Sequence, residues 1–365
     1  MPSANEAVIA AAGSGKTKRL IDEAVADPAA RVLITTYTRE NLREIKARLW
    51  REPCSARCDV TAMTWFEFLL RDGVKPYQDH KTEILSVRSI NFQRDAKAPR
   101  YTKETQFHPY YVDSANNVYK DRVSALACKL DDLSGGKVVA RIAECFDLIL
   151  IDEMQDLAGW DLTLLERLLM SRARVVAVCD PRQSVYVTNY SAKNSGLRRA
   201  KVIKWINSQE KAQRLRITEQ TESFRCNQAI CDYADALYPD MPPTTSRNTT
   251  DAGGMGVHLV RVGDLDQYRA ETGAQELRWR QDSRFASPEG RNFGEVKGMA
   301  FDRVLILPTG PITQYVETGA DLKPEARAKL YVAVTRARHS VGIMTTSRTT
   351  KSGLPFWAPA DREQH

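Results

Sequence analysis

The sequence predicts an α/β protein of two domains, each built on a parallel sheet covered by helices. Three observations lead to this fold class. The chain has 365 residues, more than one ordinary core accommodates. Short apolar runs alternate with helical patterns, which is typical of parallel sheets. The hydrophobic fraction is 42%, which favours a folded chain that buries its own cores.

The elements expected for the first domain follow one another regularly as far as residue 72. Strands are expected at Glu6–Ala12, Arg31–Thr38 and Cys58–Met63, and each leads into a helix, the first of which opens at Lys16. From residue 73 to 136 the chain is polar and rich in Tyr, Lys and Arg, so we assign this stretch to an inserted subdomain. The sheet resumes with a strand at Phe146–Asp152, a helix at Leu162–Ser171 and a strand at Arg174–Asp180.

The second domain is expected to begin in a polar passage, Asn189–Lys201. The first domain then comprises residues 1–72 and 137–195, the second comprises residues 196–350, and residues 351–365 form a frayed tail. Strands of the second domain are expected at Arg214–Thr218, Val257–Val262, Arg303–Leu307 and Ser340–Thr345.

Charge and cysteine content suggest the setting in which the protein works. Lys and Arg number 53 against 46 Asp and Glu, an excess that suits a polyanionic partner. The seven cysteines are an odd number scattered over expected strands and helices, which favours reduced thiols in the cytoplasm. Cys54 and Cys58 lack a second ligand pair at zinc spacing, so a zinc site is disfavoured. No apolar run is long enough to span a membrane, so we expect no membrane partner.

The stretch Ile9–Thr17 reads IAAAGSGKT and is nearly a phosphate-binding loop of the form G-x-x-x-x-G-K-[ST], with Ala10 at the first glycine position. In such a loop, backbone N–H groups and the start of a helix face the phosphates. Gly13 and Gly15 permit the required backbone angles, Lys16 reaches the terminal phosphates, and the Thr17 hydroxyl is suited to Mg²⁺. The residues that the chemistry needs are all present.

A second motif, LILIDEMQD, is acidic. It places Asp152 and Glu153 at the end of an apolar strand, where parallel sheets bind ligands. Asp152 is suited to hold Mg²⁺, and Glu153 to orient and deprotonate the attacking water. A lone GSGKT segment can be a simple glycine turn, and a lone acidic pair at a strand end is often only polar surface. Both motifs in this order favour an ATP site.

Four further stretches contribute polar residues to the same chemistry. VAVCDPRQSVY contains Gln183, whose amide is suited to sense a terminal phosphate, and TESFRCNQAI contains Arg225. FGEVKGMAFDRVLI contains Gly298, and KLYVAVTRARHS contains Arg336. Two arginines from a second domain opposite a phosphate loop would act as arginine fingers, each worth about 10³ to 10⁵ in rate.

Taken together, these segments resemble the UvrD/Rep-like superfamily 1 DNA helicases. AAAGSGKT resembles that family's A-x-A-G-S-G-K-T, TYTRENLREI its T-F-T-N-K-A-A-x-E-M, and MTWFEFLL its T-F-H-S-L. DEMQD is similar to D-E-x-Q-D, DPRQSVY to G-D-x-x-Q-S-I-Y, ESFR to N-Y-R-S, VKGMAFDRV to K-G-L-E-F-D-x-V, and YVAVTRAR to Y-V-A-L-T-R-A-R. The resemblance covers nearly the whole chain, and the order of the motifs makes it specific.

The resemblance implies two RecA-like P-loop NTPase domains that hydrolyse ATP in the cleft between them and move along single-stranded or tailed DNA, usually 3′ to 5′. Lys16, Asp152, Glu153, Gln183, Arg225 and Arg336 would be catalytic, and Thr17 and Asp152 would hold Mg²⁺. Phe224 would stack on the adenine. The implied nucleotide-binding residues are Ala12, Gly13, Ser14, Gly15, Lys16, Thr17, Lys18, Phe224 and Gly298. The implied DNA-binding residues are Thr36, Thr38, Thr64 and Tyr186.

Departures from the family pattern define the alternatives. No Gln stands ahead of Ala10 to read adenine, and the acidic residue and the His of the K-G-L-E-F segment are replaced by Ala300 and Gly294. The stretch between Arg225 and Lys297 is too short for the family's large second-domain insertion, so this would be a compact form that separates strands weakly. The alternative is a DNA-sensing ATPase subunit that regulates a nuclease partner, for example an OLD-like nuclease in phage defence. An RNA helicase is less favoured.

One segment of the insertion has two interpretations. FHPYYVDSANNVYKDR, residues 107–122, interleaves aromatic and cationic side chains. Such a pattern is typical of a surface that meets DNA, but it is equally typical of a packed cap with a solvated face. The sequence does not distinguish between these two roles.

Overall fold

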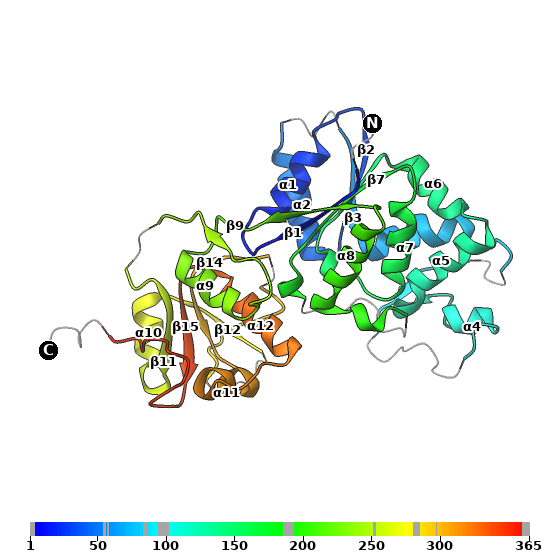
Figure 1. Ribbon diagram of the computed structural model, residues 1–365. Helices are drawn as coiled ribbons and strands as arrows, with labels where there is room; N and C mark the ends of the chain where they lie inside the picture. The colour runs from blue at the N-terminus through cyan, green and yellow to red at the C-terminus, as the bar shows by residue number, and fades with distance from the viewer. Residues whose placement is uncertain are drawn as a thin grey trace. The chain divides into compact units, whose positions relative to one another are not determined.

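The computed structural model describes residues 4–53, 56, 58–82, 86–93, 102–184, 193–250, 253–279, 285–296 and 298–359. The chain divides into two units (Figure 1). The first unit contains the chain up to Ile9, residues Lys16–Pro181 and a segment that ends at Glu219. The second contains the loop Ala10–Gly15, a short segment that begins at Arg182, and the chain from Gln220 onward.

A six-stranded sheet with the order β3-β2-β6-β7-β1-β8 forms the centre of the first unit. The strands are β1 (Glu6–Ala10), β2 (Arg31–Thr36), β3 (Asp59–Thr64), β6 (Leu148–Ile151), β7 (Arg174–Cys179) and β8 (Arg216–Gln220). The β2–β3, β2–β6, β6–β7 and β1–β7 pairs are all parallel. The central strands are buried along their whole length, as expected for a sheet covered on both faces. The predicted α/β class is therefore confirmed.

The first unit contains eight α-helices in its described residues. They are α1 (Lys16–Ala24), α2 (Arg39–Arg51), α3 (Trp65–Phe68), α4 (Phe107–Tyr111), α5 (Val123–Leu133), α6 (Lys137–Cys145), α7 (Trp160–Leu169) and α8 (Val202–Lys211). Those with an apolar stripe bury it. Helix α2 shows the pattern, since it buries Leu42, Ile45 and Leu49. Burial of each such side chain contributes about 1.5–3 kcal/mol.

The predicted insertion lies within the first unit. It contains α4, α5 and a small two-stranded parallel sheet of β4 (Ile90–Asn91) and β5 (Val118–Tyr119). Most of α5 is buried, and it packs against α7. The C-terminal part of the stretch therefore contributes to the core of the unit, whereas β4, β5 and α4 lie outside the six-stranded sheet.

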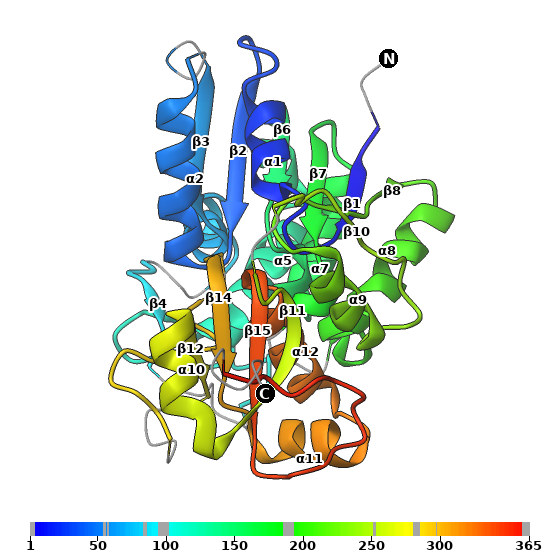
Figure 2. The same cartoon turned by 90° about the vertical axis from the view of Figure 1, so that its left-hand side faces the viewer.

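The second unit contains a five-stranded sheet with the order β11-β15-β14-β12-β13, in which all neighbouring strands are parallel (Figure 2). The strands are β11 (Gly256–Arg261), β12 (Gln275–Arg278), β13 (Arg291–Asn292), β14 (Phe301–Ile306) and β15 (Ala337–Thr345). The helices are α9 (Gln228–Ala236), α10 (Leu265–Thr272), α11 (Gly310–Thr318) and α12 (Pro324–Val334). A small parallel pair, β9 (Glu222–Ser223) and β10 (Thr245–Ser246), flanks α9 in the chain.

The boundary between the domains differs from the prediction. A start at residue 196 was expected, with the strand at Arg214–Thr218 in the second domain. In the structure β8 lies in the first sheet beside β1, and the second unit resumes at Gln220. The physical reason is the buried carboxylate of Glu6, which accepts hydrogen bonds from Arg216 and Thr218 and so fixes β8 to β1.

The C-terminal segment also differs from the prediction of a frayed tail at 351–365. Phe356 forms a parallel bridge with Leu259 of β11, and the Trp357 ring packs edge-on against Tyr268. These contacts attach the segment to the second sheet; residues 360–365 lie outside the described residues. No helix in the described ranges has the length and apolar character needed to cross a membrane.

Candidate nucleotide site and nucleic-acid surface

The phosphate loop follows β1 and leads directly into α1, as predicted. Gly13 and Gly15 have φ values of +76° and +84°, a left-handed conformation that glycine adopts without steric cost. Helix α1 begins at Lys16, so its first N–H groups lie at the end of the loop. This is the local geometry of an anion site at a helix N-terminus.

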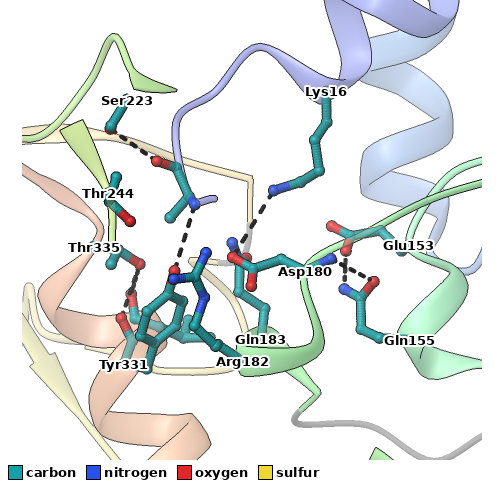
Figure 3. A network of polar contacts seen from close by, with 12 residues as sticks. Lys16, Glu153, Gln155, Asp180, Arg182, Gln183, Ser223, Thr244, Tyr331 and Thr335 are labelled. Carbon is teal, nitrogen blue, oxygen red and sulfur yellow. Dashed lines mark hydrogen bonds and ion pairs between the residues drawn. The ribbon is translucent and has the colours of Figure 1, made fainter. Parts of the chain in front are cut away.

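The carboxylates of the site lie at the carboxyl ends of strands next to β1. Asp152 and Glu153 follow β6, and Asp180 follows β7, which separates β6 from β1 in the sheet. All three residues are buried. The Lys16 Nζ lies 4.0 Å from an Asp180 carboxylate oxygen (Figure 3). The sheet therefore brings Lys16 and the strand-end acids to one edge.

Gln155 connects these acids. Its side-chain N–H donates to the Glu153 carboxylate, and its carbonyl oxygen accepts the backbone N–H of Asp180 at 3.2 Å (Figure 3). Glu153 has a φ of +57°, a strained conformation for a residue with a side chain. Backbone strain of this kind concentrates at functional sites. The hydrogen bond from Gln155 fixes the orientation of the Glu153 carboxylate.

The residues present fit a nucleotide phosphate and a divalent cation. Within the described part of the chain, the Ser14 hydroxyl is buried without a hydrogen-bond partner, which leaves it available to a ligand. No group of three or more His, Cys, Asp or Glu side chains that could hold a metal occurs among the described residues.

The second unit contributes three predicted residues that meet around Thr335. Arg336 donates to the Thr335 hydroxyl and to the Gln183 side-chain oxygen, both at 3.4 Å. Arg225 donates to the Thr335 carbonyl at 3.1 Å. The structure therefore brings Gln183, Arg225 and Arg336 together from three distant parts of the sequence.

The loop itself is held by Ser223 and Tyr331, which the sequence analysis did not single out, and by the backbone of Phe224, which it did. The Ala12 carbonyl accepts from the Ser223 hydroxyl at 2.8 Å, and the Gly13 carbonyl accepts from the Phe224 N–H at 3.0 Å (Figure 3 shows the former). The Ala12 N–H donates to the Tyr331 hydroxyl. A Cβ on Gly13 would lie 2.6 Å from the Cβ of Arg225, so only glycine fits at this position.

The other predicted nucleotide contacts lie in different environments. The Phe224 ring is 62% exposed although its backbone binds the loop, and Gly298 has a φ of +93°. Lys18 lies on the exposed side of α1, where it forms an ion pair with Asp22. Because this hydrogen bond favours the charged ammonium, the pKa of Lys18 is raised. Lys18 thus has a partner of its own away from the loop.

The predicted DNA-binding threonines follow two neighbouring strands. Thr36 ends β2 and Thr64 ends β3, and the two residues are partners in the strand register. Thr64 caps α3 in a reciprocal capping box with Glu67, and the Thr38 hydroxyl caps α2. The Thr36 hydroxyl is buried and has no partner among the described residues. Tyr186 lies outside the described residues.

Sequence analysis did not assign roles to Gln155, Asp180, Ser223, Tyr331 and Thr335. A signal existed for four of them, since Gln155 lies within DEMQD, Asp180 opens DPRQSVY, and Tyr331 and Thr335 belong to YVAVTRAR. Ser223 lies within ESFR, but nothing in that segment indicates that its hydroxyl binds a loop 211 residues earlier in the chain.

The fold and this strand-end site define a P-loop protein of the NTPase class. The family model of AAA_19, described as an AAA domain, matches residues 1–189. This match spans half of the chain, and the chain therefore belongs to the AAA_19 family. The match supports the general class in the predicted resemblance, which is a helicase-like P-loop protein of the superfamily 1 type. No curated protein matches the chain.

Several solved helicase structures resemble the chain at low identity. The arterivirus nonstructural protein 10 (helicase) has a TM-score of 0.46 and 16% identity, and the match covers 93% of this chain and 59% of that protein. The PRRSV helicase has a TM-score of 0.46 and 14% identity, with 94% and 53% covered. The arterivirus helicase in complex with DNA has a TM-score of 0.45 and 16% identity, with 93% and 60% covered. This chain therefore spans little more than half the length of these helicases.

Proposed function

We propose that the protein is an ATP-dependent translocase or helicase of superfamily 1, of the UvrD/Rep-like type, that moves 3′ to 5′ on single-stranded or tailed DNA in the cytoplasm. One observation carries the proposal. The loop with GSGKT leads into α1 with both glycines in the left-handed conformation, and Lys16 lies beside the strand-end carboxylate of Asp180. This set is suited to hydrolysis of a nucleoside triphosphate.

In this proposal the nucleotide is held by groups that the fold already orders. The loop N–H groups and the start of α1 bind the phosphates, and Lys16 contacts the terminal ones. Thr17 and Asp152 would hold Mg²⁺, which, when bound, offsets charge on the phosphates. The exposed Phe224 ring stacks on the base.

Hydrolysis then follows from the remaining side chains. Glu153 orients a water and accepts its proton as the water oxygen bonds to the terminal phosphorus and the bond to the diphosphate breaks. Gln155 fixes the orientation of that carboxylate. Arg225 and Arg336 donate to the phosphoryl oxygens as charge develops on them. Gln183, which bonds Arg336, couples the state of the nucleotide to movement.

The direct test is DNA-stimulated ATPase activity. Lys16→Ala is expected to abolish it, because the terminal phosphates lose their cation. Glu153→Gln is expected to lower kcat by about 10² to 10⁴ while nucleotide binding persists, because only the general base is lost. Exposed residues of α2 supply matched controls, since Lys46→Ala and Glu44→Gln remove the same charges elsewhere. ATPase activity that persists in the Lys16→Ala variant would contradict the proposal.

A strand-displacement assay separates the motor from the regulatory subunit. The lone chain on a 3′-tailed duplex is expected to displace the strand in an ATP-dependent way, and a 5′-tailed duplex reports the direction. ATPase activity without displacement would favour the subunit instead. The family match gives no support to a nuclease partner, so the motor is the function proposed.

A further inference from the structure

A group of aromatic side chains with one lysine lies at the end of the first sheet where the predicted DNA-binding threonines are. The Phe66 ring is 5.8 Å from the Tyr37 ring and 5.3 Å from the Phe92 ring, measured between centroids. The Lys120 Nζ lies 5.6 Å from the Phe66 centroid and 6.0 Å from that of Tyr37. We call Tyr37, Phe66, Phe92 and Lys120 the aromatic platform.

Two separate parts of the first unit build this platform. Tyr37 directly follows β2, and Phe66 lies in α3, which directly follows β3. Phe92 directly follows β4 and Lys120 directly follows β5, and these short strands pair in parallel with Asn91 opposite Tyr119. The chain leaves the small sheet at Phe92 on one strand and at Lys120, the first residue of a short 3-10 helix, on the other. Both residues lie against the Phe66 ring of the main sheet.

Hydrogen bonds hold the small sheet in place. The Asp113 carboxylate accepts from the backbone N–H groups of Ala115 and Asn117 and from the Asn91 side chain. Burial raises the pKa of Asp113, but these hydrogen bonds favour the charged form more strongly, and the pKa is lowered overall. The position of Phe92 is thus fixed by ordered backbone on both strands.

The platform combines an exposed ring with a half-buried cation. Phe92 is 56% exposed although aromatic neighbours hold it. Lys120 forms no ion pair among the described residues, although its charge counteracts the burial that raises the pKa of the neighbouring Asp121. Directly before Tyr37, the buried Thr36 hydroxyl has no hydrogen-bond partner in that same part of the chain. An exposed ring with an ammonium group nearby is an arrangement that binds a base and its phosphate.

The aromatics of residues 107–111 have a different role, which resolves the two interpretations of that segment. Tyr111 is buried and donates to Glu104, and the Phe107 ring lies 4.8 Å from it. The Arg122 guanidinium lies 3.6 Å from the Tyr110 ring centroid. These side chains form a packed cap. Lys120 is the residue of this segment that belongs to the platform.

We propose that the aromatic platform is a stacking site for one base of single-stranded DNA, with the base on Phe92 and an adjoining phosphate at Lys120. The proposal rests on the proposed function, because it names a DNA contact for the same motor. It assigns this contact to two residues outside the motifs that resemble the helicase family. A protein partner would not need a cation beside an exposed ring, whereas a polyanion with flat bases uses both.

The experiment measures binding of a labelled oligothymidylate by fluorescence anisotropy over a range of salt concentrations. Phe92→Ala is expected to weaken binding about tenfold, and Phe92→Trp to restore it. Lys120→Ala is expected to weaken binding and to reduce the slope of log affinity against log salt by about one. Trp50→Ala and Lys46→Ala are the matched controls, since both residues are exposed on α2 and Trp50 is 89% exposed. Both controls should bind as wild type does.

An oligonucleotide of abasic sites separates stacking from a structural effect. On this backbone without bases, Phe92→Ala and wild type should bind equally, and ATPase activity without DNA should be unchanged in the variant. Wild type that binds oligothymidylate while Phe92→Ala binds within twofold of it would overturn the platform and leave the motor standing. A loss of equal size on the abasic strand would also overturn it. Wild type that binds no oligothymidylate would overturn the platform and the proposed function together.

Discussion

The two units differ in the charged groups that they contribute to the candidate site. In the first unit these groups are carboxylates, with the side chain of Gln155 beside Glu153 and the Lys16 ammonium beside Asp180. In the second unit one of them is Arg336, which is 1% exposed and donates to the carbonyls of Val332 and Met299. Val332 lies in the last turn of α12, where carbonyls carry partial negative charge.

This difference indicates a division of labour. Carboxylates beside a phosphate loop are suited to a metal ion and a water, whereas a guanidinium is suited to donate several hydrogen bonds to a phosphate. In the proposed function, the first unit would activate the attacking water, and the arginines of the second unit would stabilise the negative charge that develops on the phosphoryl oxygens.

The largest expected effect tests the arginine side of the comparison. Arg336→Ala is expected to lower kcat of the DNA-stimulated ATPase by about 10³ to 10⁵, because charge on the transferred phosphoryl group is no longer offset. Steady-state ATPase assays measure the change in kcat, and equilibrium binding of a fluorescent nucleotide measures any change in affinity separately. Arg336→Lys keeps the charge in the fold but loses the forked geometry, so it controls for loss of structure. A kcat within tenfold of wild type for both variants would contradict the assignment.

A smaller effect tests the carboxylate side. Gln155→Ala is expected to lower kcat about tenfold with little change in KM for ATP, because Glu153 keeps its charge but loses the amide that orients it. The double variant Gln155→Ala, Glu153→Gln should be no slower than Glu153→Gln alone, since Gln155 acts through Glu153. Additive losses in the double variant would show that Gln155 has an independent role.

The smallest expected effect on hydrolysis is at Glu6, a buried carboxylate of the first sheet that lies outside the site. Burial raises its pKa, but hydrogen bonds from Thr218 and Arg216 and the charge of Arg19 lower it more, and the pKa falls below 4.5 overall. Glu6→Gln should leave kcat unchanged and should lower the free energy of unfolding at pH 7 by about 2 kcal/mol, because ion pairs to β8 are lost.

The pH dependence of this stability difference has a definite sign. The folded-state pKa of Glu6 is lower than its unfolded value, so the stabilisation is fully present above pH 4.5 and is lost as the pH falls through the folded-state value. Urea unfolding at pH 7 and at about pH 3 would measure it. A difference between variant and wild type that grows on acidification would refute this reading of the Glu6 cluster.

Strands with apolar patterns could be predicted from sequence, and polar strands could not. β6 and β7 are apolar runs and were expected within one or two residues of their observed bounds. β12 was missed because its residues read Gln-Glu-Leu-Arg. Glu276 and Arg278 are nevertheless buried, and Glu276 pairs with Arg269 at 2.6 Å. A charged residue that is buried against a partner on a neighbouring helix leaves no apolar pattern in the sequence.

The sequence by itself determined the class of the protein and the identity of the phosphate loop, because strand periodicity and the glycines at positions 13 and 15 are local properties of the chain. Only the tertiary structure decided three further points: β8 joins the first sheet, Gln155 links Glu153 to Asp180, and Lys120 and Phe92 both lie against Phe66. Each of these depends on a contact between residues that are far apart in sequence or on different elements. Such contacts are set by burial and hydrogen bonding across the whole fold, which no local pattern encodes.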